Sequence, residues 1–239
     1  VHVSCSERWR HFMRLLITEV TDMSAGSFCV AGWDIDSHVM IRPLPNGSNW
    51  TTATIAQYAV EPGILMEFSP TGRAHNGSFP HTTEDTEVNA ANISVIDRSA
   101  QNWLGPNSPS RARTVQEAFG GNVESGSEYR GRLQSLYVGS GTRCRSLWGI
   151  EVPRENIEFI SDSYKGGPER LKAVVDDGDH RYVFSVSSHS LKEAFGHGGL
   201  AAVEALLPAS GQLHVRLGLA RPFSDAPKKC NLMLNGVYG

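Results

Sequence analysis

The stretch FCVAGWDIDSHVMIRPLP, residues 28–45, contains the clearest signal for the fold. Two apolar runs with β-branched and aromatic residues flank a short polar segment, DIDSH, which is typical of two antiparallel strands joined by a turn. The run FMRLLITEV, residues 12–20, precedes them and is separated from them by the turn-like segment TDMSAGS. The sequence therefore predicts a three-strand meander near its start.

Further strands are expected along the chain, with helices only as short connectors. Asp177-Gly178 lies between two alternating runs and favours a hairpin turn. Short helices are expected in NGSNWTTATIAQYA, in VQEAFGG and in SLKEAFGHGG, where Ser190 and Glu193 have the spacing of a capping box. Other strands are expected in EPGILMEFSP, TEVNAANISVI, LQSLYVG, SLWGIEVP, IEFI, QLHVRLGLA and KCNLMLNGVY, whereas NVESGSEYRGR reads as loop.

This pattern predicts a mostly-β protein of two OB-like small barrels with short connecting helices. Many short strands at turn-marked spacing favour small barrels or a sandwich over a βαβ sheet. We expect a first OB-like barrel over residues 1–100, a basic connector of loop and short helix over residues 101–141, and a second OB-like barrel over residues 142–239.

The sequence argues against several classes of site. The four cysteines form no CxxC pair and lack partnered histidines, so we expect a reduced cytoplasmic protein without a zinc site. No apolar run approaches the roughly 18 to 20 residues that cross a bilayer, and no signal-peptide core is evident, so no membrane partner is expected. His75 and His81 lack a third metal ligand, and no Walker, dinucleotide-binding or G-x-S-x-G motif appears. We therefore expect no cofactor.

The charge of the chain is unevenly divided. Residues 18–97 contain ten acidic residues against Arg42 and Arg73, a net charge of −8, whereas residues 98–145 have a net charge of +4. Lys and Arg drive binding to phosphate backbones. Nucleic-acid contacts are therefore expected on the middle segment or in a local pocket. The candidate contacts in the middle segment are Arg111, Arg113, Arg143 and Arg145.

Two Arg-Pro steps end apolar runs, VMIRPLP at residues 39–45 and LHVRLGLARPF at residues 213–223. A proline has no N–H for the ladder and pushes the preceding residue to extended conformations, so the strand must end or become an edge there. Arg42 and Arg221 are thus expected at strand ends, where a guanidinium can bind a phosphate or carboxylate. The alternative is that each arginine pairs with a carboxylate and joins the two barrels.

The acidic segment TEDTE, residues 83–87, is the expected counterpart of these arginines. Glu84 and Asp85 repel each other unless a partner or water neutralises them. They could clamp the arginines, form a polar pocket or serve acid–base chemistry, or the segment could be a solvated loop.

The loop RPFSDAPKK places an aromatic ring and two lysines next to Arg221. A basic loop with an aromatic residue is the kind of feature that stacks a base and holds its phosphate. The candidate ligand-binding residues are therefore Phe223, Lys228 and Lys229, together with Arg42, Glu84, Asp85 and Arg221. Phe223 could equally close the end of a barrel.

Several segments, taken in order, resemble a bacterial family described as a dual-OB-containing domain, often regarded as nucleic-acid modification proteins. These segments are CVAGWDIDSHVMIRPLP, EPGILMEF, HTTEDTEV, VRLGLARPF and KKCNLMLNGVY, and they span nearly the whole chain. In that family an aromatic residue precedes the I-R-P step, where this sequence has Met40. The resemblance implies two OB folds and a role in bacterial antiviral defence, with a partner protein of such a system possible.

Three functions are compatible with these observations. The leading expectation is a binding module for nucleic acid or a nucleotide. The second is an enzyme that modifies nucleic acid or a nucleotide, with Arg42, Glu84, Asp85 and Arg221 as its polar centre. The third is a protein-interaction or sensor subunit whose arginines only join the barrels.

Overall fold

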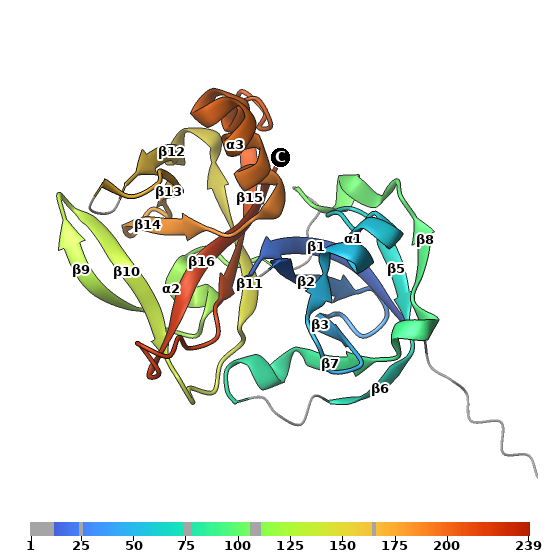
Figure 1. Cartoon of the computed structure of the whole chain (residues 1–239). Coiled ribbons are helices and arrows are strands. Elements are labelled where there is room, and N and C mark those ends of the chain that lie inside the picture. The colour runs from blue at the N-terminus through green and yellow to red at the C-terminus, as the bar shows by residue number, and fades with distance from the viewer. Residues whose placement is uncertain (1–11, 24–25, 74–77, 106–110, 164–165) are drawn as a thin grey trace, which may run out of the picture.

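Two curled, mostly antiparallel sheets of eight strands each lie side by side (Figure 1). The computed structural model describes residues 12–23, 26–73, 78–105, 111–163 and 166–239. Short strands dominate both halves of the chain, and helices occupy only the connections between them. The predicted mostly-β class and the two small barrel-like sheets are therefore confirmed.

The first sheet has the strand order β6-β7-β3-β2-β1-β5-β8, with β4 paired to β2. The predicted meander is present, because β1 pairs with β2 and β2 pairs with β3, both antiparallel. The strands are β1 (Met13–Asp22), β2 (Ser27–Asp34), β3 (Val39–Pro45), β4 (Trp50–Thr51), β5 (Leu65–Phe68), β6 (Pro70–Arg73), β7 (Asp85–Val88) and β8 (Ser94–Asp97).

The second sheet has the order β11-β15-β16-β10-β14-β13-β12, with β9 paired to β10. The predicted hairpin at Asp177-Gly178 joins β13 and β14 in antiparallel register. The strands are β9 (Glu124–Tyr129), β10 (Arg132–Gly139), β11 (Leu147–Pro153), β12 (Ile157–Asp162), β13 (Arg170–Asp176), β14 (Arg181–Val186), β15 (Gln212–Leu219) and β16 (Lys229–Tyr238).

Among the described residues, three α-helices connect the strands: α1 (Thr52–Tyr58), α2 (Val115–Ala118) and α3 (His189–Glu204). Short 3-10 helices are η2 (His81–Thr83), η3 (Ala90–Asn92), η4 (Ala100–Trp103) and η5 (Arg154–Asn156). The N-cap of α3 is Ser188, whose hydroxyl accepts from the Leu191 backbone N–H, so the predicted N-cap at Ser190 is wrong by one half turn. No helix in the described part of the chain is long and apolar enough to span a membrane.

Each sheet encloses its own apolar core, and a third, smaller cluster lies where the sheets meet. Ala31 and Met40 of the first sheet contact Leu147 of the second in that cluster. β1 and β15 are buried over almost their whole length. A strand buried on both faces reads as a continuous apolar run instead of an alternating one. The runs LLITEV and LHVRLGL thus mark the strands at the junction of the two barrels.

Two segments differ from their predicted structure. Residues 124–129, predicted as loop, form β9, whereas the predicted strand LQSLYVG is present as β10; both belong to the second sheet, although the expected connector extended to residue 141. Every residue of β9 is exposed, so its sequence lacks the apolar alternation that identifies a strand. TEVNAANISVI forms two strands, β7 and β8, because the Asn89 side chain accepts from the Ala91 N–H and starts η3 between them.

Candidate functional site

Arg42 and Arg221 meet at one carboxylate at the junction of the barrels. β3 changes its pairing partner from β2 to β7 at Arg42, and β7 pairs with it in parallel so that Arg42 lies opposite Asp85. Arg42 Nη1 donates to Asp85 Oδ1 at 2.6 Å, and Arg221 Nη2 donates to Asp85 Oδ2 at 2.5 Å. Because Arg221 follows β15 of the second barrel, Asp85 joins the two halves of the protein.

The two arginines differ in exposure. The Arg42 residue is 5% exposed, whereas the Arg221 side chain is 40% exposed. Arg42 uses its remaining nitrogens inside the protein, since Nε contacts Cys29 Sγ at 3.2 Å and Nη2 donates to Ser146 Oγ at 3.1 Å. Burial alone would lower the pKa of Arg42, but nearby Cys29, Asp85 and Glu84 raise it. Arg42 is therefore a permanently charged structural cation.

Glu84 is held between the barrels by a separate set of donors. Its Oε1 accepts from the Ser146 N–H at 2.8 Å, and its Oε2 accepts from Ser146 Oγ at 2.8 Å and Thr83 Oγ1 at 2.7 Å. Burial raises the pKa of Glu84. Glu84 and Asp85 are 3% and 2% exposed, so the alternative of a solvated acidic loop is wrong. All four carboxylate oxygens accept hydrogen bonds from protein groups, an arrangement that suits positioning and not proton transfer.

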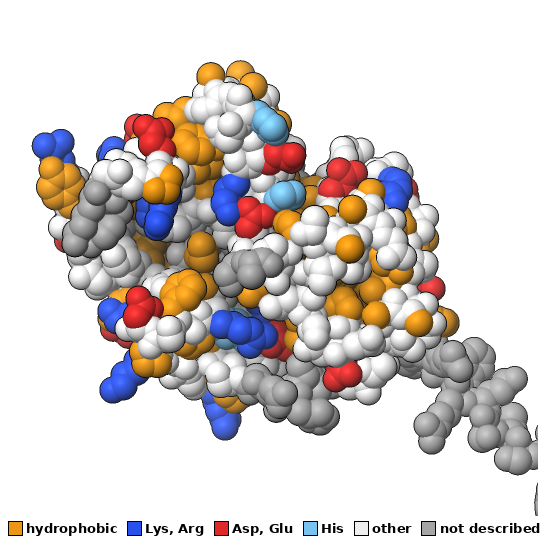
Figure 2. Space-filling model, in the orientation of Figure 1, with side chains coloured by type: hydrophobic (Ala, Val, Ile, Leu, Met, Phe, Trp, Pro, Cys, Tyr) orange, Lys and Arg blue, Asp and Glu red, His pale blue; other side chains and the backbone are white. Residues whose placement is uncertain are grey.

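A cavity of about 650 Å³ opens between the barrels, with Arg42 and Arg221 among the residues that line it. A second cavity of about 730 Å³ lies on the outward face of the second barrel. The two cavities adjoin, because Arg170, Lys192, Phe223 and Met233 line both; together they are called the groove below. Figure 2 shows this face hollowed over β14 and β16, with Lys and Arg side chains around the hollow.

The floor of the groove is the outward face of β13 and its neighbours. Leu171 and Ala173 point into the core, so the alternate positions Arg170 and Lys172 point outward. Lys172 Nζ donates to Ser185 Oγ of β14 at 2.9 Å, which leaves two of its N–H groups for a ligand. Arg170 is exposed and has no polar partner among the described residues.

Aromatic and cationic side chains line the groove, together with two acidic residues, Asp162 and Glu169. Helix α3 contributes Lys192 and Phe195, and the segment after β15 contributes Phe223, which is 52% exposed. Lys192 Nζ pairs with Asp22 at 2.6 Å across the barrel junction, and His189 Nδ1 contacts the same carboxylate at 2.7 Å. Phe223 does not close a barrel end, because half of its surface stays open to solvent.

His81 lines the inter-barrel cavity from η2 and is only 1% exposed. Its Nε2 lies 2.8 Å from the Leu219 carbonyl oxygen, so Nε2 carries the proton and donates. Burial, with the charge of Arg42 as a smaller contribution, lowers the pKa of His81 to about 4. His81 is therefore neutral at pH 7, and its buried Nδ1 has no partner among the described residues.

A second buried ion pair joins the barrels away from this site. Arg216 Nη2 and Nε donate to Glu19 Oε1 at 2.7 and 3.0 Å, and both side chains are 1% exposed. Asn235 Nδ2 donates to Glu19 Oε2 at 2.6 Å. The pair links β1 to β15 and lies in the two strands that are buried on both faces. Sequence reasoning missed it, although charges inside runs as apolar as LLITEV and LHVRLGL are a signal of pairing.

The other predicted contacts lie outside the groove. Lys228 is exposed, and Lys229 Nζ lies 3.9 Å from the centre of the Tyr137 ring. Arg111 pairs with Glu151 at 2.8 Å, and Arg113 is exposed. The remaining two arginines stack on aromatic rings: Arg143 on Phe79 at 5.3 Å and Arg145 on Trp148 at 3.8 Å. Sequence reasoning missed Arg170, Lys172 and Lys192, although the alternation in RLKAVV places the first two on one face.

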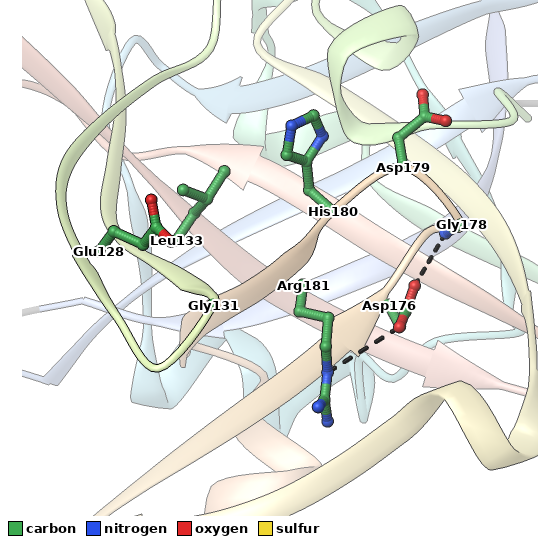
Figure 3. A pocket seen from close by; sticks show the side chains of 8 residues that line it. All are labelled: Glu128, Gly131, Leu133, Asp176, Gly178, Asp179, His180 and Arg181. Atoms are coloured by element: carbon green, nitrogen blue, oxygen red, sulfur yellow. Dashed lines mark hydrogen bonds and ion pairs between the residues drawn. The ribbon is translucent and has the colours of Figure 1, made fainter.

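A smaller cavity of about 270 Å³ lies between the β9–β10 hairpin and the turn joining β13 to β14. Figure 3 shows that Asp179 and His180 point to one side of this turn, while Arg181 points to the other. Asp176 Oδ1 accepts a hydrogen bond from the Gly178 N–H at 3.0 Å, and Asp176 Oδ2 forms an ion pair with Arg181 Nε at 3.9 Å. The polar groups thus diverge, and no cluster of metal-binding side chains occurs in the described residues. The groove is the better candidate site.

Comparison with protein-family models, with curated proteins and with solved structures gave no match for this chain.

Proposed function

We propose that this protein is a binding module for single-stranded nucleic acid or a nucleotide, and that its ligand lies in the groove. One observation carries the proposal: exposed Phe223 and the outward cations Arg170 and Lys172 border the same depression. Stacking of bases on aromatic rings together with a cationic surface for the backbone is the usual way in which proteins bind single strands.

The spacing of the cations supports an extended ligand. Arg170 and Lys172 are two positions apart on β13, which corresponds to about 6.6 Å along a strand. This separation is similar to the distance between successive phosphates of an extended single strand. Phe223 and Phe195 lie along the same groove and offer apolar faces for bases. The resemblance to dual-OB-containing proteins supports the same ligand class and a role in bacterial defence.

The buried carboxylates give no support to an enzymatic function at the arginine pair. Asp85 is shared by Arg42 and Arg221, and Glu84 is held by Ser146 and Thr83. These contacts support a scaffold that fixes Arg221 at the cavity wall. A binding function requires that Arg221 is held in place at the cavity wall, which these contacts do. An acid–base function requires instead a carboxylate that is free to exchange a proton with substrate.

Fluorescence anisotropy with an oligothymidylate of about eight nucleotides, within the range that one OB fold covers, tests the proposal. We expect the double variant Arg170→Ala/Lys172→Ala to weaken binding at least tenfold and to reduce the dependence of affinity on salt, because each lost phosphate contact lowers the salt slope by about one unit. Arg181→Ala is the matched control, since Arg181 is an exposed cation of neighbouring β14 outside the groove. Binding that is absent in the wild type, or equally weak in the control, would exclude the function.

A further inference from the structure

The inner end of the groove differs from the rest of it. On the second barrel the groove is an open face, but at its inner end the lining includes the buried side chains of Arg42 and His81. There the barrels are joined by the contact of His81 with the Leu219 carbonyl and by the contact of Arg221 with Asp85. The barrel junction, with these two contacts, thus lies at the inner end of the groove.

Arg221 is prepared to receive an anion at this end. Its Nη2 is fixed on Asp85, and Asp85 is in turn fixed by buried Arg42. Arg221 Nε and Nη1 have no partner among the described residues, and the side chain is 40% exposed. A guanidinium with a fixed plane and free N–H groups can bind two oxygens of one phosphate in parallel. The contact that orients Arg221 therefore also prepares it for a ligand.

The charges around the cavity favour an anion over a neutral group. Arg170 and Lys192 line the cavity together with Arg221. Asp22 is the one acidic side chain among the described residues that line it, and it is already paired with Lys192 and His189. A terminal phosphate monoester carries about −1.5 to −2 charges and three acceptor oxygens, whereas each phosphodiester within a strand carries a single charge. A terminal phosphate should therefore bind more favourably at this position than a phosphodiester within the strand.

We propose that the inter-barrel cavity is an end-binding site, in which Arg221 holds the terminal phosphate of a single strand lying in the groove. The inference rests on the proposed function and adds to it the part of the ligand that is recognised. Arg221 is the binding residue, and Asp85 is a positioning residue that acts through it. The chemistry is common to 5′- and 3′-phosphates, and the experiment separates them.

The test compares one oligothymidylate with a 5′-phosphate, a 3′-phosphate or hydroxyl groups at both ends. One phosphorylated form is expected to bind wild-type protein about tenfold more tightly than the hydroxyl form, the size of effect given by charge-assisted hydrogen bonds. Arg221→Ala should abolish the difference, and Arg221→Lys should reduce it, because lysine keeps the charge but loses the fork. Arg181→Ala should leave it unchanged.

The wild-type comparison requires no variant to fold and is decisive by itself. Equal affinities of all three oligonucleotides would overturn end recognition but would leave the proposed binding function intact. Absence of binding by all three would instead remove the proposed function. A phosphate preference that persists in Arg221→Ala, with an unchanged melting temperature, would assign the phosphate to other residues and overturn the role of Arg221.

Discussion

At the scale of single residues, one carboxylate serves two arginines with different tasks. Asp85 accepts from Arg42, which is buried, and from Arg221, which faces the cavity. A buried ion pair matters for stability mainly because removal of one partner leaves the other charge buried and unpaired, which is costly. Arg42 is therefore expected to matter for stability, and Arg221 for binding.

Arg42→Ala should lower the free energy of unfolding by about 3 to 5 kcal/mol, since it removes a buried partner from Asp85 and a donor to Ser146. Denaturant unfolding followed by tryptophan fluorescence measures the change. Arg145→Ala is the control, because Arg145 is an exposed cation stacked on Trp148 and its loss should cost about 1 kcal/mol or less. Similar losses for both variants would contradict the structural role of Arg42.

His81 makes stability depend on pH in acid. Its pKa falls from 6.5 in the unfolded chain to about 4 in the folded protein, so between these values the unfolded state binds more protons. The contribution of His81 is complete above pH 6.5 and is lost as the pH falls through this window. Glu84, whose pKa burial raises, acts in the opposite sense, so a variant of His81 is needed to isolate the effect.

We expect His81→Gln to lose less stability than the wild type between pH 7 and pH 4.5, because glutamine Nε2 can still donate to the Leu219 carbonyl without titrating. Urea midpoints at the two pH values measure the difference. His197→Gln serves as control, since His197 is 82% exposed and should follow the wild type. Parallel pH profiles for wild type and His81→Gln would contradict the lowered pKa of His81.

At the scale of elements, α3 shows how a glycine pair shapes the wall of the groove. The helix carries Lys192 and Phe195 in its first half, and its regular dihedral angles are interrupted at Gly198 and Gly199. Gly199 has φ 64° and ψ −155°, a region that side chains rarely enter. The interruption ends the first segment of the helix and lets the second continue in a new direction.

Gly199→Ala should destabilise the protein by about 1 to 3 kcal/mol, because alanine is strained at this backbone conformation. Gly196→Ala, three residues earlier in the regular part of the same helix, should stabilise it by about 0.5 to 1 kcal/mol, since an added Cβ meets no atom within 4 Å there. Thermal unfolding of the two variants measures both changes. Equal and small shifts would mean that α3 runs through without the interruption.

The elements predicted by sequence are those with a local signal. The meander of β1 to β3 has apolar runs and short turns, and the hairpin of β13 and β14 has Asp177-Gly178. β9 has no such signal, because all its side chains face solvent and its place is fixed by backbone pairing to β10. A strand held by main-chain pairing and a few polar side-chain contacts, such as Tyr137 Oη to Glu124, leaves no trace in hydrophobic periodicity.

At the scale of the whole molecule, the barrels are joined by charges as well as by apolar contact. Glu19 and Arg216 link β1 to β15, and the Asp22 N–H donates to the Ser187 carbonyl at 3.0 Å. The small apolar cluster with Ala31, Met40 and Leu147 lies at the same junction. Such a junction couples the two cores, so the protein is expected to unfold in a single transition.

Arg216→Met should lower the free energy of unfolding by about 3 to 5 kcal/mol, because Glu19 would remain buried without its cation. Arg14→Met is a matched control on β1, since the Arg14–Asp36 pair is about half exposed and its loss should lower stability far less than the loss of Arg216. Calorimetry and circular dichroism measure stability and cooperativity. Separate transitions of the two barrels in the wild type would contradict the coupling.

The sequence by itself determined the mostly-β class, the positions of most strands and the candidacy of Arg42, Asp85 and Arg221, because alternation, turn residues and Arg-Pro steps act within a few neighbouring residues. Only the tertiary structure decided that Asp85 lies between both arginines, that Glu84 is buried, and that Arg170 and Lys172 share a groove with Phe223. These relations arise when segments far apart in the chain pack against each other, and no local pattern encodes the burial or the partner that results.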